Sequence, residues 1–213
     1  MKYQLVLWDF DGTLADTLTL ALQIYNRVAA EKHFLTITDP HAVRCMGMRE
    51  FLKAHRIPAY YVPMLFSVVL AELKTHAADI ALHPGVGDAL RRISHLGIVQ
   101  GIVSSNNTET IRCCLDNHGV SHLFQSITGT SRLFGKERQI CRVYQKLNLS
   151  ADRVLYVGDE IRDIQAADSA GLDIAAVTWG LNSAAALAAC QPAYLAADPA
   201  DLVKILNDGV LPL

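Results

Sequence analysis

The chain has 213 residues, of which 51% are hydrophobic and 19% charged, so it can bury the core of one domain with a modest insertion. Its formal net charge of −2 gives no electrostatic case for binding nucleic acid or an anionic membrane, and we expect a small solute as the partner. The five cysteines include no C-x-x-C pair, which argues against a disulfide framework or a zinc site.

The first residues also bear on location. The N-terminal apolar run stops at Asp9, which is too short for the core of a signal peptide. The longest uncharged stretch, residues 174–197, is interrupted by Gly180, Asn182 and Pro192, and is not typical of a membrane span. We therefore expect a cytoplasmic protein.

In chain order, the apolar residues 5–8 predict a buried strand that runs into Asp9. A helical segment follows: Leu18, Leu22 and Val28 recur at helical spacing, and Asp39 with Pro40 at the next position is typical of a helix start. A further apolar run covers residues 60–77. We predict a helical cap domain at 16–83, inserted into a core domain formed by 1–15 and 84–213.

From Pro84 onward, helical patterns alternate with short apolar runs, which is the signature of βαβ units and a parallel sheet. The predicted class is therefore α/β, with a doubly wound parallel sheet. We predict helices at 85–96, 109–119, 136–147 and 163–171, strands at 98–105, 123–129, 154–158 and 173–179, a short strand near Tyr194, and a helix opened by Asp198 and Pro199.

Such sheets bind ligands beyond the carboxyl ends of their strands, so the residues that follow each strand are the candidates for chemistry. Asp9 and Asp11 come directly after the first strand, on one face of an extended chain and about 7 Å apart. A hard divalent cation such as Mg²⁺ would compensate for two crowded carboxylates. Asp11-Gly12 is also ordinary turn chemistry, so this segment alone does not decide.

Polar residues follow three other predicted strands. Ser104 and Ser105 end one strand just before a helix, where hydroxyls and free backbone N–H groups suit an anion or simply cap the helix. Lys136 begins the next helix and could contact a phosphate or remain in solvent, with Arg132 and Arg138 as competitors. The last strand end carries Asp159, with Asp163 one helical turn further on, which repeats the crowding of carboxylates.

Taken together, these strand ends form four motifs: D-x-D-x-T at Asp9, Asp11 and Thr13, then Ser104, then Lys136, then G-D-x3-D at Asp159 and Asp163. With these motifs in this order, the chain resembles the haloacid dehalogenase superfamily, in its phosphoglycolate phosphatase-like branch with a helical cap. Dehalogenases of that superfamily do not keep the second aspartate, so Asp11 favours phosphoryl transfer.

The resemblance implies a two-step reaction in which Asp9 attacks phosphorus to form an aspartyl-phosphate, while Asp11 protonates the leaving oxygen and then activates water. It also implies Mg²⁺ as the cofactor. The ion would be bound by the Asp9 carboxylate, the Asp11 backbone carbonyl and Asp159, with Asp163 as a ligand or a supporting residue and Glu160 in a water-mediated role.

The resemblance further implies which residues bind the substrate. Relatives often have Lys-Pro where this chain has Lys136-Glu137, which leaves the pose of the lysine open. In the cap, Arg44 or Arg49 could meet a substrate anion. The expected substrate-binding residues are Thr13, Ser104, Ser105, Asn106, Lys136 and Arg49.

The expected function is Mg²⁺-dependent hydrolysis of a small phosphorylated metabolite. A pyrophosphatase or another phosphotransferase of the superfamily would have similar motifs. A receiver-like phospho-acceptor module is an alternative of another class, but such modules lack an insertion of this length after the first strand. Either a monomer or a homodimer fits, since the apolar run 60–73 could mediate a dimer.

Overall fold

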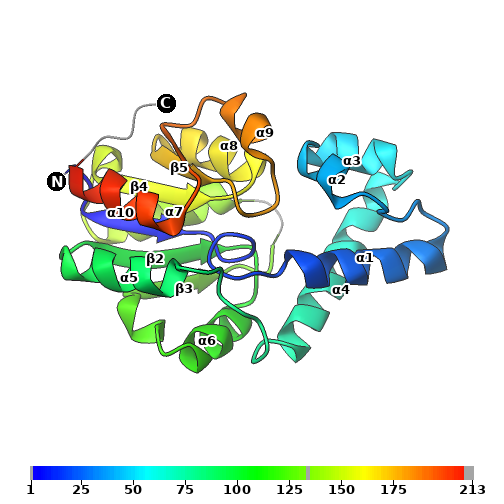
Figure 1. Ribbon diagram of the computed structural model, residues 1–213, viewed down its shortest axis with the longest axis horizontal. Helices are drawn as coiled ribbons and strands as arrows, with labels where there is room; N and C mark the ends of the chain where they lie inside the picture. The colour runs from blue at the N-terminus through cyan, green and yellow to red at the C-terminus, as the bar shows by residue number, and fades with distance from the viewer. Residues whose placement is uncertain (1, 133–134, 209–213) are drawn as a thin grey trace.

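The computed structural model describes residues 2–132 and 135–208, and it is built on a six-stranded parallel sheet with the order β3-β2-β1-β4-β5-β6 (Figure 1). This is the doubly wound order, in which β2 and β3 are added on one side of β1 and β4 to β6 on the other, so the predicted fold class is confirmed. The strands are β1 (Leu5–Trp8), β2 (Val99–Ser104), β3 (Ser126–Gly129), β4 (Val154–Gly158), β5 (Asp173–Val177) and β6 (Tyr194–Ala196).

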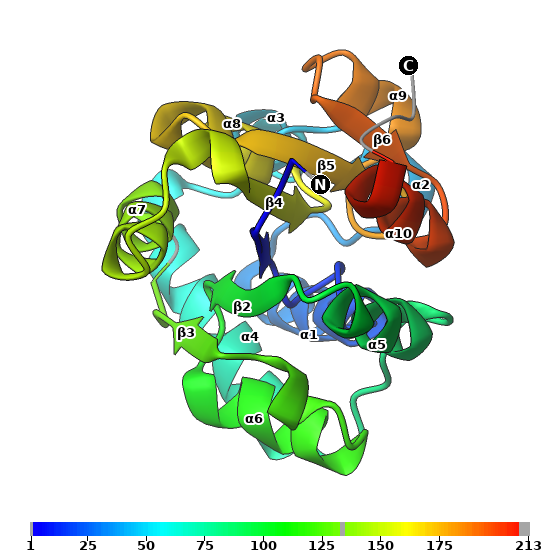
Figure 2. The same ribbon diagram turned by 90° about the vertical axis from the view of Figure 1, so that its left-hand side faces the viewer.

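Strand β1 shows why the sheet is covered on both faces. Its four residues are at most 1% exposed, and they alternate: Val6 and Trp8 belong to one core cluster, while Leu5 and Leu7 belong to another. Figure 2 shows helices on both sides of the sheet. The first cluster is covered by α5 (Val86–His95), α6 (Thr108–Asn117) and α10 (Pro199–Asp208), and the second by α7 (Lys136–Lys146), α8 (Ile161–Ala170) and α9 (Ala184–Ala188).

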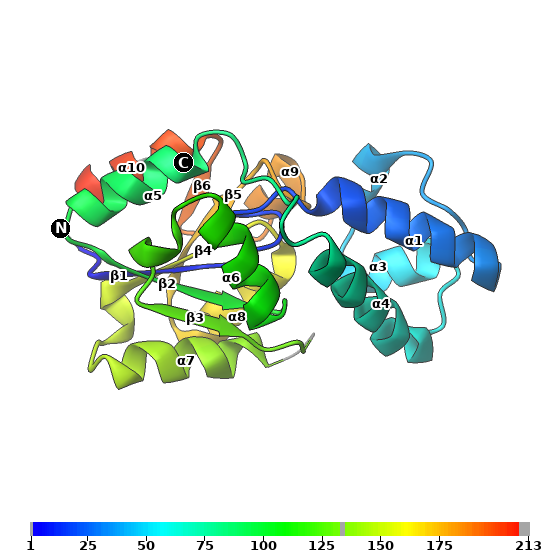
Figure 3. The same cartoon turned by 90° about the horizontal axis from the view of Figure 1, so that it is seen from below.

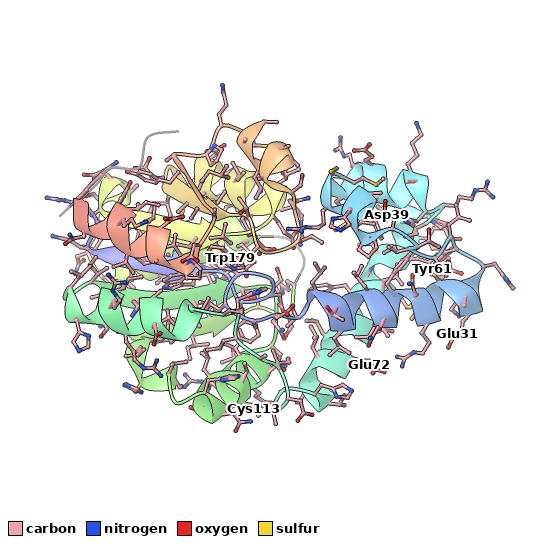
Figure 4. All side chains as sticks on the ribbon, viewed as in Figure 1. Glu31, Asp39, Tyr61, Glu72, Cys113 and Trp179 are labelled. Carbon is pink, nitrogen blue, oxygen red and sulfur yellow. The ribbon has the colours of Figure 1, made fainter. Side chains whose placement is uncertain are left out.

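Four helices between β1 and β2 form a separate body, which we call the cap (Figures 1 and 3). The cap has a small core of its own, centred on Tyr25, Val43 and Ile57. The Asp39 carboxylate, labelled in Figure 4, accepts a hydrogen bond from the His41 amide and so caps the second helix as predicted. The cap helices are α1 (Leu18–Lys32), α2 (Pro40–Arg44), α3 (Met48–Ala54) and α4 (Val62–Thr75).

The two chain segments that join cap and core run side by side. Ala15 and Leu82 form an isolated antiparallel bridge, and the Asp16 amide donates to the Ala81 carbonyl at 2.9 Å. The predicted domain bounds, 1–15 with 84–213 and 16–83, remain predictions. Their terminal residues 1 and 209–213 lie outside the described part of the chain.

The structure corrects the sequence prediction in local details. Helix α8 begins at Ile161 rather than at Asp163, because the side chains of Glu160 and Asp163 form a capping box with the backbone amides. The short helix α9, opened by a hydrogen bond from the Ala186 amide to Ser183, was not predicted. Strand β3 is confined to 126–129, because residues 121–123 form a 3-10 turn.

Of the described residues, no helix by itself combines the length and apolar character that a membrane span requires. One pair of helices, Met48–Ala54 and Ala59–Thr75, meets both criteria together, but it is bent by 111°.

Candidate active site

The candidate site lies at the point where the strand order reverses. Strands β1 and β4 are direct neighbours, and Asp9 and Asp159 are the first residues after each of them. The Asp9 amide still donates to the Val157 carbonyl at 2.8 Å, which extends the ladder by one residue and fixes where its side chain emerges. This is the position at which doubly wound sheets bind ligands.

Three carboxylates converge there into an acidic triad of Asp9, Asp159 and Asp163. The residues are 5%, 1% and 1% exposed, and one oxygen from each lies within 4.8 Å of the others. Small residues make room for them: a Cβ atom on Gly12 or Gly180 would collide with the Asp159 carboxylate. The triad therefore depends on glycines in two separate loops.

Lys136, the first residue of α7, reaches into the triad. Its Nζ atom donates to Asp9 Oδ2 at 2.8 Å and to Asp163 Oδ1 at 2.6 Å, and its side chain is only 15% exposed. Burial by itself lowers the pKa of Lys136, but the carboxylates of Asp163 and Asp9 outweigh burial and hold it well above the usual value. Lys136 is therefore a fixed positive charge inside the acidic site.

Burial and neighbouring charges disfavour the ionised forms of Asp159 and Asp163. Burial, and then the charges of Glu160 and Asp163, raise the pKa of Asp159 well above its ordinary value. The pKa of Asp163 is also raised, chiefly by burial, against the lowering effect of Lys136. A group of buried carboxylates that resists ionisation in this way is the arrangement that a bound divalent cation would relieve.

The Asp11 carboxylate has a different partner. The side-chain amide of Asn106 donates to Asp11 Oδ1 at 3.0 Å and to Oδ2 at 3.1 Å. Burial and then the nearby charge of Asp9 raise the pKa of Asp11 to about 7, although Asn106 and Thr17 lower it. A carboxyl group that titrates near neutral pH is suited to both giving and accepting a proton.

Two of the predicted substrate-binding hydroxyls are occupied by internal hydrogen bonds. Thr13 is fully buried and donates through Oγ1 to Asp159 Oδ1 at 2.7 Å. Ser104 is 1% exposed and accepts from the Asn106 amide at 3.1 Å, while its neighbour Ser105 is half-buried. The structure thus brings Thr13 to the triad and Asn106 to Asp11, and it places Ser104 in a supporting position.

The cap arginines are in different environments. Arg49 is exposed on α3. Arg44, the alternative, donates from its guanidinium to the Thr178 carbonyl at 2.9 Å and to the Leu181 carbonyl at 3.3 Å, both in the core. The guanidinium of Arg44 therefore joins cap to core.

Glu160 is paired with Arg162 by two hydrogen bonds of 2.7 and 2.9 Å. Burial raises the pKa of Glu160, but the guanidinium outweighs burial, and the net shift is downward. A bidentate pair of this kind keeps the Glu160 carboxylate ionised and holds its position.

Sequence reasoning missed the loop 178–183, which follows β5. The Leu181 amide donates to Asp159 Oδ2 at 2.7 Å, and the indole N–H of Trp179, labelled in Figure 4, donates to the Thr13 carbonyl at 3.0 Å. The available signal was Gly180 directly after the strand predicted at 173–179, which ends with Trp179, at the same edge of the sheet as the four motifs.

A doubly wound sheet with buried carboxylates at its switch point defines a Rossmann-like α/β enzyme. The sequence profile of the haloacid dehalogenase-like hydrolases matches residues 6–177, and the chain belongs to that family. The predictions of family and of an enzyme are confirmed.

Relatives match along almost the whole chain. A phosphoglycolate phosphatase of Synechococcus elongatus is 30% identical over 206 residues, covering 96% of this chain and 97% of the relative. A pyrophosphatase, PpaX of Oceanobacillus iheyensis, is 27% identical, covering 98% and 99%. A haloacid dehalogenase-like hydrolase structure from Streptococcus pneumoniae superposes with a TM-score of 0.80 at 21% identity, covering 96% and 99%, and supports the fold.

Proposed function

We propose that the protein is a Mg²⁺-dependent phosphatase that hydrolyses a small phosphate monoester through an aspartyl-phosphate on Asp9. The observation that carries the proposal is the buried triad with Lys136 inside it, close to an Asp11 carboxyl that titrates near neutral pH. Phosphate ester hydrolysis is so slow without a catalyst that a nucleophile, an acid and charge stabilisation are all needed.

The donor set fits Mg²⁺. Three buried carboxylates offer hard oxygen ligands, and burial together with the charges of Glu160 and Asp163 raises the pKa of Asp159, an effect that a bound cation would oppose. Asp9, Asp159 and Asp163 would hold the ion, together with the backbone carbonyl of Asp11. When bound, the ion supplies positive charge for the phosphoryl oxygens.

The chain's own groups would then act as follows. The Asp9 carboxylate attacks phosphorus as the bond to the leaving oxygen breaks, and Asp11 gives its proton to that oxygen. In the second step Asp11 takes a proton from water, which attacks phosphorus and releases phosphate and the Asp9 carboxylate. Lys136 supplies fixed charge beside the transferring group, and Asn106 orients the Asp11 carboxyl.

The relatives narrow the substrate class without naming the compound. A phosphoglycolate phosphatase and a pyrophosphatase match to similar extents, so a phosphate monoester and pyrophosphate are the two candidates. We propose the ester as substrate, because the match to the phosphoglycolate phosphatase is the stronger in identity. Arg49 of the cap is proposed to meet the rest of the substrate. We also propose a cytoplasmic location, since the exposed Cys45 and Cys113 are free thiols, which suits a reducing compartment.

The test is turnover of p-nitrophenyl phosphate with Mg²⁺, comparing the wild type with Asp9→Asn and with the wild type in EDTA. Asp16→Asn is the matched control, because Asp16 is an exposed aspartate in the same segment. We expect sustained turnover that is abolished by Asp9→Asn and by EDTA and retained by Asp16→Asn. Full activity of Asp9→Asn would refute the assignment of the nucleophile.

Two further measurements separate the alternatives. Rates on phosphoglycolate, sugar phosphates and pyrophosphate compare the ester with the pyrophosphatase reaction. A receiver-like module would instead accept one phosphoryl group and release it slowly, so a single labile phosphorylation without turnover would support that class.

A further inference from the structure

The loop 178–183 connects the cap to the core in addition to the two chain linkers. From the loop, the Ser183 amide donates to the Arg44 carbonyl at 2.7 Å, and the Asn182 side-chain amide donates to the carbonyls of Arg44 at 3.1 Å and Met46 at 3.2 Å. Figure 1 shows α2 on the side of the cap that faces α9. The contact is therefore made by the end of α2 and the residues just after it.

The same loop also contacts the acidic triad. The Leu181 amide donates to the Asp159 carboxylate, and the Asn182 amide donates to the Asp159 carbonyl at 3.2 Å. In addition, Asn182 Oδ1 accepts from the Ile161 amide at 2.9 Å, at the first residue of the helix that carries Asp163. One side chain thus touches the cap and the start of α8, while its backbone touches Asp159.

The side-chain amide of Asn182 uses both its N–H groups and its oxygen in this bridge. The residue is 3% exposed, both N–H groups of its amide are used on cap carbonyls, and its oxygen is used on α8. Only one orientation of the amide satisfies all three bonds, since two partners are acceptors and the third is a donor. A buried amide with each partner on a different segment ties those segments to one geometry.

The cap is also attached through its linkers. The two linkers pair at Ala15 and Leu82, and the side-chain amide of Asn117 on α6 donates to the Ala78 carbonyl at 2.9 Å. The linkers and the Asn182 contact therefore attach the cap to the core through separate segments of the chain.

We propose that Asn182 is a positioning residue that couples the seating of the cap to the geometry of Asp159 and the start of α8. When residues 44–46 are seated, both amide hydrogens of Asn182 are held and the loop keeps its hydrogen bond to the Asp159 carboxylate. Coupling between two sites is reciprocal, so the factor by which the seated cap strengthens binding of a cation at Asp159 is also the factor by which that cation would favour the seated cap. Only this last consequence rests on the proposed metal site.

The test compares Asn182→Ala with Asn117→Ala, which removes a side-chain amide bond of the same kind near the linker. Hydrogen exchange is measured on the metal-free protein at the Ser183 and Leu181 amides, and Mg²⁺ binding is measured by calorimetry. Removing the bridging bonds should accelerate exchange at both amides by about tenfold or more, at about 0.5–1.5 kcal/mol per bond. We also expect Asn182→Ala to weaken Mg²⁺ binding by about threefold or more, and Asn117→Ala to leave both quantities unchanged.

Kinetics give a readout that mere loss of stability would not move. In Asn182→Ala the Mg²⁺ concentration that gives the half-maximal rate should rise, and kcat at saturating Mg²⁺ should change by a smaller factor than that concentration does. Unchanged exchange at Ser183 together with unchanged Mg²⁺ affinity would overturn the coupling. If Asn182→Ala does not fold, Arg44→Gln is the second variant, because it removes the guanidinium bonds from the cap to the same loop. This variant should also accelerate hydrogen exchange at the Ser183 amide, and an unchanged exchange rate would overturn the coupling.

The coupling and the proposed function can fail separately. A wild type that hydrolyses no phosphate ester, with exchange and Mg²⁺ affinity still altered in Asn182→Ala, would leave the coupling intact and remove the phosphatase. An active wild type with no response to Asn182→Ala would do the reverse.

Discussion

Replacing Lys136 by Met tests the electrostatic account of the site. The change keeps an aliphatic side chain of similar length and removes the ammonium that lies 2.8 Å from Asp9 and 2.6 Å from Asp163. The three side chains are 15%, 6% and 1% exposed, so solvent screens the lost interactions only weakly. Removing one partner of a buried ion pair costs about 3–5 kcal/mol, because the other charges stay buried.

We expect the lower end of this range, since carboxylates whose pKa is already raised can take up protons instead. The free energy of unfolding of the metal-free protein should fall by about 3 kcal/mol, which corresponds to about 6–12 °C in Tm for a chain of this size. The variant also lacks the ammonium that occupies oxygens of Asp9 and Asp163, so Mg²⁺ should stabilise the variant by more than it stabilises the wild type.

The assay is urea unfolding followed by circular dichroism, in EDTA and in Mg²⁺. Lys146→Met is the matched control, because Lys146 is an exposed lysine at the other end of the same helix and should change stability by less than about 1 kcal/mol. If metal-free Lys136→Met unfolds within about 1 kcal/mol of the wild type, the buried charge is not compensating the carboxylates and the reasoning is wrong.

Three other predictions concern the triad, the core and pH. Asp159→Asn should abolish the stabilisation by Mg²⁺. It should also leave the metal-free protein at least as stable as the wild type, because a carboxyl whose pKa is raised by folding opposes folding at neutral pH. Thermal unfolding with and without Mg²⁺ measures both effects. Leu90→Ala should lower the free energy of unfolding by about 2–5 kcal/mol in urea, because Leu90 is fully buried, whereas Leu35→Ala at a 45% exposed position should cost less than about 1 kcal/mol. Burial lowers the pKa of His83, so below about pH 6.5 the unfolded chain binds a proton at this residue more readily than the folded protein does. The free energy of unfolding of the wild type should therefore fall, relative to that of His83→Gln, as the pH drops through that region. A difference in unfolding free energy between the two proteins that stays constant with pH would contradict this.

The fold was largely predictable because its signals are local and repeated. Strand β1 is a run of four apolar residues, and the alternation of helix and strand patterns after Pro84 predicts parallel pairing. Helix α9 was missed because its sequence, five residues of Ala and Leu, has no periodicity that separates a helix from a buried strand. The start of α8 was misplaced because the capping box places Asp163 inside the helix rather than at its start.

The sequence also indicated most of the site, since each motif follows a predicted strand. It could not show which partner each side chain takes. Thr13 was expected at the substrate, but its hydroxyl donates to Asp159, and Arg44 could face a substrate in sequence terms, but its guanidinium binds carbonyls in the loop 178–183. These pairings join residues more than a hundred positions apart, and no local pattern encodes them.

The kind of chemistry available can be read from the sequence alone: four carboxylates and a lysine at the ends of apolar strands, in an order that implies one family. How their charges balance depends on the folded arrangement. The reason is physical, because the pKa of a buried carboxyl depends on distances between atoms from different strands and on the water excluded around them, and these distances exist only once the chain has folded.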